Sequence, residues 1–197
     1  MTSAPLPVAV FLSGGGRTLS NLIDQRDQGR LDVDLRVVIS SKPSAGGVAI
    51  ANAAGIETRT VVKSTFAGDE DYCQAMFDPC RQHGVKLVVM AGFLKHVLIP
   101  EDFRGRVINI HPSLLPEFGG QGMYGAHVHR AVINAGAGKS GCTVHFVDNV
   151  YDNGPPILQL ACDVDPSDTA ESLAAKVFQL ECRALPKAIR LITAQLN

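Results

Sequence analysis

The sequence predicts an α/β fold in which a mostly parallel, twisted sheet ends in an antiparallel pair of strands. Five short apolar runs alternate with stretches long enough for helices, which is the pattern of parallel strands joined by right-handed crossovers. These runs lie at residues 8–12, 35–39, 58–62, 85–91 and 106–110. Two further runs, at 141–148 and 156–164, are separated only by a short turn rich in Asn, Gly and Pro, which favours an antiparallel pair. The length of 197 residues fits one domain with a substantial core.

The first apolar run is followed by three consecutive glycines and then by the start of a helix. Gly14, Gly15 and Gly16 leave backbone N–H groups free at a helix N-terminus, where the helix dipole favours an anion. A phosphate would fit there, and a plain strand-to-helix turn is the simpler alternative. A dinucleotide site is less well supported, because the third glycine of that motif is missing and the second run ends in Ser40-Ser41-Lys42, without a ribose-binding acid.

The fifth apolar run leads into the segment Asn109-Ile-His-Pro-Ser-Leu-Leu-Pro116. In a strand, Asn109 and His111 project to the same face, and Pro112 then ends the strand. An uncharged donor beside a group that titrates near neutrality suits a reaction in which negative charge develops on a carbonyl oxygen. The alternative is a strand end whose polar side chains satisfy backbone groups of the loop.

The C-terminal part of the chain is predicted to hold a loop, a turn and a long helix. Phe118 to Gly125 contains four glycines and is expected to be a mobile loop at the site, and Asp152 lies in the turn between the last two strands. Asp168, with Glu171 three positions later, predicts the N-cap and N3 positions of the final helix. Pro186 is expected to kink or restart that helix.

Other reactive residue types give weaker signals. His127 and His129 are two positions apart and do not share a helix face, so a metal site is not expected. His145, in a predicted strand, is expected to be a hydrogen-bonded structural residue. The five cysteines are odd in number and lack paired spacing, so we expect them to be reduced. Among them, Cys142 could suggest a thiol nucleophile, but no motif supports that role.

Composition favours a small ligand. Eighteen basic and nineteen acidic residues give a formal charge of -1, and no Lys/Arg cluster indicates a nucleic-acid or membrane surface. Met1 to Pro7 lacks the basic region and apolar stretch of an export signal, and no apolar segment approaches the length of a membrane span. A cytoplasmic location is therefore expected.

Five segments together resemble the phosphoribosylglycinamide formyltransferase family of purine synthesis. The glycine loop, Val88 to Phe93, the 109–116 block, the Asp152 turn and Gln179 to Glu181 occur in the order seen in that family, and the similarity covers nearly all 197 residues. The resemblance implies a single-domain, Rossmann-like formyltransferase fold over residues 1–197. It also implies that the N-terminal half binds the phosphate and ribonucleotide, and that the C-terminal half binds folate.

The resemblance also implies roles for particular residues. Arg17-Thr18 stands where Ser-Asn is usual in the phosphate loop, and Lys95 stands where an Arg is common. Ordinary core packing is the alternative for Leu94 and Val97. The implied catalytic residues are Asn109, His111 and Asp152. The implied ribonucleotide-binding residues are Gly14, Gly15, Gly16, Arg17, Thr18 and Glu181. The implied folate-binding residues are Met90, Leu94, Lys95, Val97, Asp148 and Asp152.

The implied reaction is direct attack of the glycinamide ribonucleotide amine on the formyl group of 10-formyltetrahydrofolate, a cosubstrate, with no metal. Asp152 is expected to orient His111 and to favour its imidazolium form. The enzyme is expected to be a monomer or homodimer that acts on small molecules. Alternatives are a formyltetrahydrofolate hydrolase, a formyltransferase for another amine, and a non-catalytic nucleotide-binding module. The hydrolase and the initiator-tRNA enzyme usually carry an extra domain that this sequence is not expected to contain.

Overall fold

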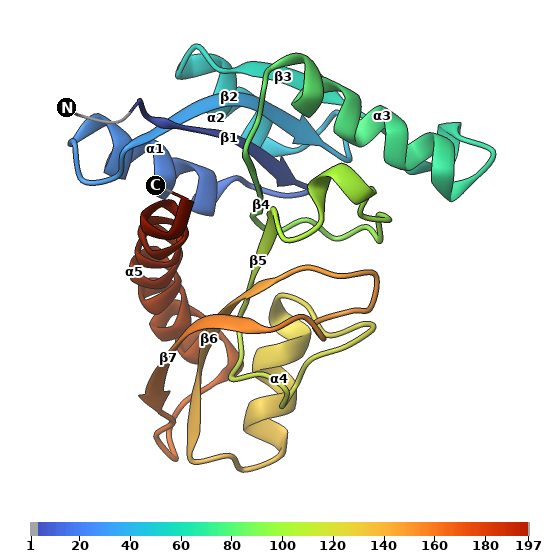
Figure 1. The fold of residues 1–197 in the computed structure, drawn as a ribbon. Helices are drawn as coiled ribbons and strands as arrows, with labels where there is room; N and C mark the ends of the chain where they lie inside the picture. Colours follow the sequence, from blue (N-terminus) through green and yellow to red (C-terminus); the bar gives the residue numbers. More distant parts are fainter. Residues whose placement is uncertain (1–3, 197) are drawn as a thin grey trace. The chain divides into compact units, whose positions relative to one another are not determined.

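The chain alternates strands and helices in the predicted order (Figure 1). The computed structural model describes residues 4–196 and divides into an N-terminal unit, residues 1–108, and a C-terminal unit, residues 109–197. The first part of the chain forms β1 (Leu6–Leu12), α1 (Arg17–Asp27), β2 (Val33–Ser40), α2 (Gly46–Ala53), β3 (Glu57–Thr60), η1 (Lys63–Thr65), α3 (Asp69–Gln82), β4 (Leu87–Met90) and η2 (Glu101–Phe103). The second part forms β5 (Val107–His111), α4 (Ala126–Asn134), β6 (Lys139–Phe146), β7 (Pro156–Asp163) and α5 (Ala170–Leu196).

The strands form the mixed sheet that the apolar runs predict. Seven strands are hydrogen-bonded in the order β3-β2-β1-β4-β5-β6-β7. β1 pairs in parallel with β2 and with β4, β2 pairs in parallel with β3, and β6 pairs antiparallel with β7. The predicted fold class is confirmed, including its antiparallel C-terminal pair.

The strand order reverses between β1 and β4. The chain builds outward from β1 through β2 to β3 and then returns to place β4 on the other side of β1. In open α/β sheets, ligands bind outside the carboxyl ends of the strands at such a reversal. The glycine loop follows β1 and residues 91–97 follow β4, so the connectivity of the N-terminal unit brings these two segments to that position.

Aromatic side chains hold α3 against the sheet of the N-terminal unit. The buried face of α3 includes Tyr72, Met76 and Phe77. The ring of Phe77 lies 5.4 Å from Phe11 of β1 and 4.9 Å from Phe103, centroid to centroid, in edge-on and tilted arrangements that favour aromatic attraction. These contacts link α3 to η2 and to β1, the strand that leads into the glycine loop.

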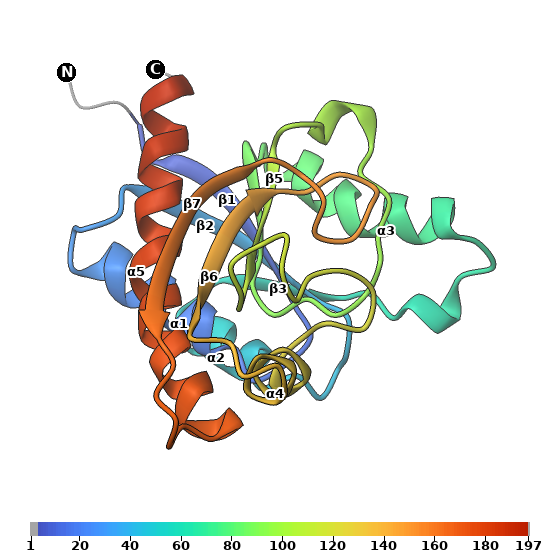
Figure 2. The same ribbon diagram turned by 90° about the horizontal axis from the view of Figure 1, so that it is seen from below.

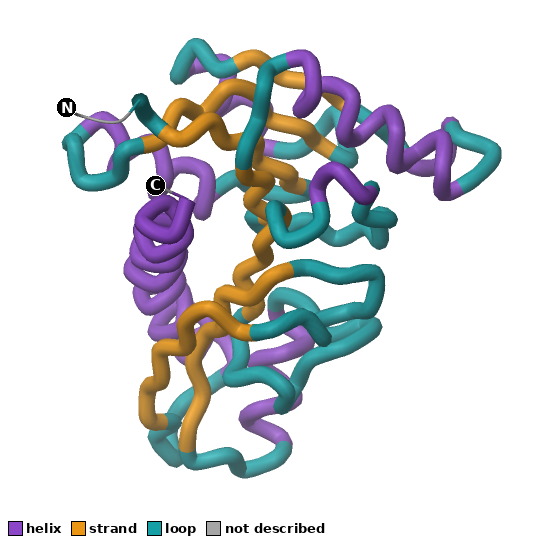
Figure 3. The backbone as a smooth tube through the Cα atoms, in the orientation of Figure 1, coloured by secondary structure: helices purple, strands orange, loops and turns teal. Residues whose placement is uncertain are grey.

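The C-terminal unit is built around the β6–β7 hairpin. α5 packs against both of these strands and against α4 (Figure 2). β6 is buried along nearly its whole length, and a Cβ atom at Gly141 would collide with the Leu160 carbonyl of β7, so only glycine fits that close approach. Between β5 and α4 the chain forms a long loop (Figure 3).

Two details of α5 differ from the prediction. The capping box uses Thr169 and Ser172, whose backbone N–H groups and hydroxyls bond reciprocally at 3.0 and 3.2 Å. The predicted N-cap, Asp168, lies one residue earlier and instead accepts hydrogen bonds from Lys176 and from the backbone of Asp165. The helix also continues through Pro186 without restarting. Within residues 4–196, no helix combines the length and apolarity needed to cross a bilayer.

The glycine loop allows a direct test of local packing. Gly16 has φ +80°, and a Cβ atom there would collide with the Gly47 backbone of α2, whereas Gly15 faces open space. Gly16→Ala should lower the free energy of unfolding by about 2 kcal/mol or more, because a left-handed backbone penalty adds to the collision. Gly15→Ala, the matched control, should change it by less than about 0.5 kcal/mol. Urea unfolding measures both, and equal midpoints for the two variants would contradict this packing.

Candidate active site

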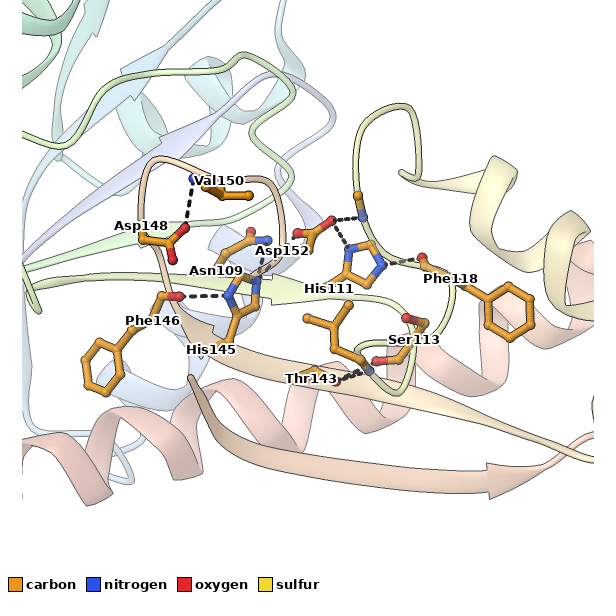
Figure 4. A network of polar contacts seen from close by, with 12 residues as sticks. Asn109, His111, Ser113, Phe118, Thr143, His145, Phe146, Asp148, Val150 and Asp152 are labelled. Atoms are coloured by element: carbon orange, nitrogen blue, oxygen red, sulfur yellow. Dashed lines mark hydrogen bonds and ion pairs between the residues drawn. The ribbon is translucent and has the colours of Figure 1, made fainter. Parts of the chain in front are cut away.

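A buried carboxylate, Asp152, lies at the centre of a polar cluster in the C-terminal unit (Figure 4). Its side chain is 12% exposed. Oδ2 accepts a hydrogen bond of 2.9 Å from the backbone N–H of Gly120 and lies 3.5 Å from His111 Nδ1, while Oδ1 lies 3.6 Å from His145 Nε2. The predicted pair of His111 and Asp152 is therefore brought together by the structure.

His111, the last residue of β5, has both ring nitrogens engaged. Nε2 lies 2.9 Å from the carbonyl oxygen of Phe118. Because a carbonyl only accepts, Nε2 carries the proton, and in the neutral ring the lone pair of Nδ1 faces the Asp152 carboxylate. This geometry fixes the tautomer of the neutral ring and leaves neither nitrogen exposed in the present loop conformation.

Burial and charge act against each other on His111. Burial lowers its pKa below the ordinary value and is the largest effect, and His145 adds to the lowering. The Asp152 charge and the Phe118 carbonyl raise the pKa but do not outweigh burial. Asp152 thus favours the imidazolium form, as expected, but the net effect of the surroundings is a lowered pKa.

Asp152 remains ionised despite its position. Burial alone would raise its pKa, but the interaction with His145, the charge of His111 and the Gly120 N–H bring the pKa below the usual value. Its backbone has φ 51°, a left-handed conformation that is uncommon outside glycine, and Phe118 has φ 55°. Such strain persists only where surrounding contacts over-determine it, and it clusters at functional sites.

Asn109 contacts the cluster through His145, which the sequence analysis did not connect with Asn109. Its Nδ2 lies 3.3 Å from Nε2 of His145, a residue expected only to be structural. His145 is 2% exposed, and its Nδ1 lies 2.8 Å from the carbonyl oxygen of Phe146. No sequence motif linked His145 to Asn109.

A second buried group, Thr143, holds the segment that follows β5. Its hydroxyl donates to the Ser113 carbonyl at 2.7 Å and accepts from the backbone N–H of Leu115 at 3.0 Å. Gln159 of β7 also donates to this hydroxyl, and Ser113 donates to the Glu117 carbonyl at 2.6 Å. Thr143 therefore fixes the path by which the chain reaches Phe118, and no sequence motif indicated it.

The glycine loop is an uncapped helix N-terminus in the N-terminal unit. α1 begins at Arg17 with Gly16 as its N-cap, without a side-chain cap and without an acidic residue in its first turn. Gly14 and Gly15 are exposed, and Thr18 is half-buried. The first helical N–H groups and the positive end of the dipole suit an anion. The space beside Gly16 is filled by α2, whereas Gly14 and Gly15 face open space. We therefore assign the predicted close approach of a ligand to Gly14 and Gly15.

The predicted folate residues of the N-terminal unit follow β4. Met90 and Val97 are 6% and 5% exposed, while Leu94 is 45% exposed and Lys95 is exposed. The hydroxyl of Ser13, beside the glycine loop, accepts the backbone N–H of Leu94 at 2.9 Å. The segment after β4 is thus tied directly to the segment after β1.

The remaining predicted residues lie in the C-terminal unit. Asp148 is exposed and accepts hydrogen bonds from the Val150 backbone at 2.8 Å and from Asn153 at 3.1 Å, so it stabilises the turn that carries Asp152. Glu181 is half-buried on α5. Burial, followed by the charge of Glu181, raises the pKa of Cys142 to about 12, so this thiol is protonated at neutral pH and is a poor nucleophile. Among the described residues no group of three His, Cys, Asp or Glu side chains could hold a metal ion.

Comparisons with known proteins agree with this arrangement. A profile of the formyl transferase family matches residues 6–189. The chain is 42% identical over 182 residues to a chloroplastic phosphoribosylglycinamide formyltransferase of Vigna unguiculata, covering 88% of this chain and 56% of that protein. It is 34% identical over 185 residues to the phosphoribosylglycinamide formyltransferase of Escherichia coli (strain K12), covering 92% and 84%. A crystal structure of glycinamide ribonucleotide transformylase 1 from Symbiobacterium toebii matches with a TM-score of 0.89 at 32% identity, covering 98% and 90%. The chain thus spans little more than half the length of the plant relative.

The opposing effects on His111 can be separated by titration. Asp152→Asn should move the midpoint of His111 further down in pH, because the carboxylate is the main influence that favours the charged ring. Histidine ring signals in an NMR pH titration measure the midpoint. Asp163→Asn, which removes an exposed carboxylate from β7 of the same unit, should leave the midpoint unchanged. A midpoint that rises in Asp152→Asn would overturn the assignment.

Proposed function

Because the chain belongs to the formyl transferase family, we propose that it transfers the formyl group of 10-formyltetrahydrofolate to the amine of glycinamide ribonucleotide in purine biosynthesis. The observation that carries the proposal is the buried cluster in which Asp152 contacts His111 and in which Asn109 supplies a neutral donor. These groups can stabilise an oxyanion and manage a proton without a covalent enzyme intermediate.

The proposed reaction is direct attack of the amine on the formyl carbon. A C–N bond forms, the carbonyl oxygen becomes an oxyanion, and the bond from carbon to N10 of the folate then breaks. The amine loses a proton, which Asp152 would help to remove through water, and N10 gains one. Asn109 and the Nε2–H of His111 would donate to the oxyanion, and each donor would contribute roughly 2–4 kcal/mol by analogy with other oxyanion sites.

The proposal requires the loop after β5 to move. His111 Nε2 now donates to the Phe118 carbonyl, so an oxyanion would have to replace that carbonyl as the acceptor. The left-handed backbone of Phe118 lowers the cost of leaving this conformation, because the strain is released. In the same proposal, Ser113 and residues 117–127 would close over the bound substrates and limit hydrolysis of the formyl donor.

We assign substrate contacts within each unit as part of the proposal. In the N-terminal unit, the glycine loop with Arg17 and Thr18 would hold the phosphate, supported by the uncapped start of α1. Met90, Leu94, Lys95 and Val97 of that unit would contact the folate, supported by their place after β4 at the strand-order reversal. In the C-terminal unit, Asp148 and Asp152 would contact the folate, and Glu181 would bind the ribose hydroxyls.

Several further features belong to the same proposal. Residues 1–197 would act as one formyltransferase domain, as a monomer or homodimer in the cytoplasm, on small molecules and without nucleic-acid or membrane partners. The chemistry uses hydrogen bonds and proton transfer, so we expect it to need no metal.

The proposed activity predicts that release of tetrahydrofolate depends on the acceptor. The protein is incubated with 10-formyltetrahydrofolate, with and without glycinamide ribonucleotide, while tetrahydrofolate, formate and formylated ribonucleotide are followed. Tetrahydrofolate should appear in step with formylated product only when the ribonucleotide is present. Formate released at the same rate without the acceptor would identify a hydrolase instead, and another formylated amine would identify a different acceptor.

The phosphate assignment predicts a selective effect on one substrate. Gly15→Val should raise the Michaelis constant for the ribonucleotide by roughly tenfold, about 1.4 kcal/mol of binding, because a side chain would stand where the anion approaches. The constant for the folate should change little. Gly68→Val is a matched control, since Gly68 also precedes a helix of the N-terminal unit and faces open space. Equal effects of Gly15→Val on both substrates, in a protein shown to be folded, would remove the assignment.

A further inference from the structure

His145 is buried and closely packed, although no role has been assigned to it so far. The pairing of β6 with β7 shifts register between Val144 and His145, where Ile157 of β7 is the extra, unpaired residue. Close packing supports the shifted backbone, because a Cβ atom at Gly154 would collide with the Phe146 carbonyl. The ring is 2% exposed, so it has no alternative partner in solvent.

The contacts of this ring fix its tautomer. Nδ1 lies 2.8 Å from the Phe146 carbonyl, which can only accept a hydrogen bond, so Nδ1 carries the proton. In the neutral ring, Nε2 then has only a lone pair and must accept from its neighbour at 3.3 Å, the side-chain amide of Asn109. Only the NH2 end of that amide can donate, so the ring determines which way the amide is turned.

We propose that His145 is a positioning residue that holds the NH2 end of the Asn109 amide ready to donate to the oxyanion. The inference rests on the proposed function and extends it. The two ends of an amide are alike in shape but opposite in hydrogen bonding, and a reversed Asn109 would present an oxygen to the developing negative charge. One hydrogen of the NH2 group bonds to His145, and the second remains for the substrate.

The Asp152 carboxylate provides the competing arrangement. Its Oδ1 lies 3.6 Å from the same Nε2. If Nε2 carried a proton, His145 would donate to Asp152 and to the oxygen of Asn109, which would turn the NH2 end away. The proposal therefore requires that Nε2 be unprotonated, and the protonation of this one atom distinguishes the two arrangements.

The first test compares two substitutions of His145. Gln places an acceptor oxygen near the position of Nε2, whereas Leu fills similar space with no acceptor. His145→Leu should lower kcat by roughly a hundredfold, in the range found for loss of an oxyanion donor, and His145→Gln should retain kcat to within about fivefold. Michaelis constants for both substrates should change by less than about threefold in each. Equal losses of kcat in the Gln and Leu variants would overturn the proposal.

Double-mutant cycles then identify the partner through which His145 acts. In an Asn109→Ala background, His145→Leu should cause no further loss of kcat, because the group that it positions is already absent. Losses that multiply in this cycle would overturn the proposal. A second cycle combines His145→Leu with Asp152→Asn. If the losses of kcat are additive with Asn109→Ala but not with Asp152→Asn, His145 acts through the carboxylate and the proposal is overturned.

A spectroscopic measurement is independent of turnover. Nitrogen-15 NMR of the His145 ring at the assay pH should show a protonated Nδ1 and an unprotonated Nε2. A protonated Nε2 would overturn the proposal even if the wild type is fully active. A wild type without formyl transfer would refute the proposed function, and the ring signals would still report whether the amide of Asn109 is held as inferred.

Discussion

The burial of one carboxylate constrains most of the C-terminal unit. A charged group with the exposure of Asp152 is costly unless donors or opposite charges surround it. The partners come from different segments: Gly120 from the loop after β5, His111 from β5 itself and His145 from β6. Contacts from these three segments meet at one carboxylate, so Asp152 ties the loop and both strands into one arrangement. The left-handed backbone at Asp152 is acceptable under the same constraint.

Two main-chain carbonyls determine which ring nitrogen of each histidine carries a proton. Phe118 takes the Nε2–H of His111, which leaves Nδ1 facing Asp152, whereas Phe146 takes the Nδ1–H of His145, which leaves Nε2 facing Asp152. The rings are therefore held in opposite tautomers by groups that cannot titrate.

The sequence was informative where one local pattern determines one local structure. Alternation of apolar runs was enough to predict the strands, and the turn after β6 was enough to predict the antiparallel pair. Asn109 and His111 could be found because strand periodicity and Pro112 act over a few residues. His145 and Thr143 could not be recognised, because their roles depend on backbone carbonyls and on loops distant in sequence. The effect of Asp152 on His111 could be predicted, but the net lowering of the His111 pKa could not, because burial is a property of the whole fold and here it outweighs the charge of Asp152.

The opposite tautomers also bear on how a proton could leave the reacting amine. Asp152 accepts a hydrogen bond from Gly120, and one ring nitrogen of His111 and one of His145 face the same carboxylate. The cluster can therefore accept one proton between Asp152 and a facing nitrogen with little movement of heavy atoms. A coupled group of this kind titrates as a unit, so its affinity for a proton is not that of any single residue. In the proposed reaction, attack of the amine on the formyl carbon releases one proton, and collapse of the intermediate consumes one at the departing nitrogen. A cluster that can hold a single proton suits both steps.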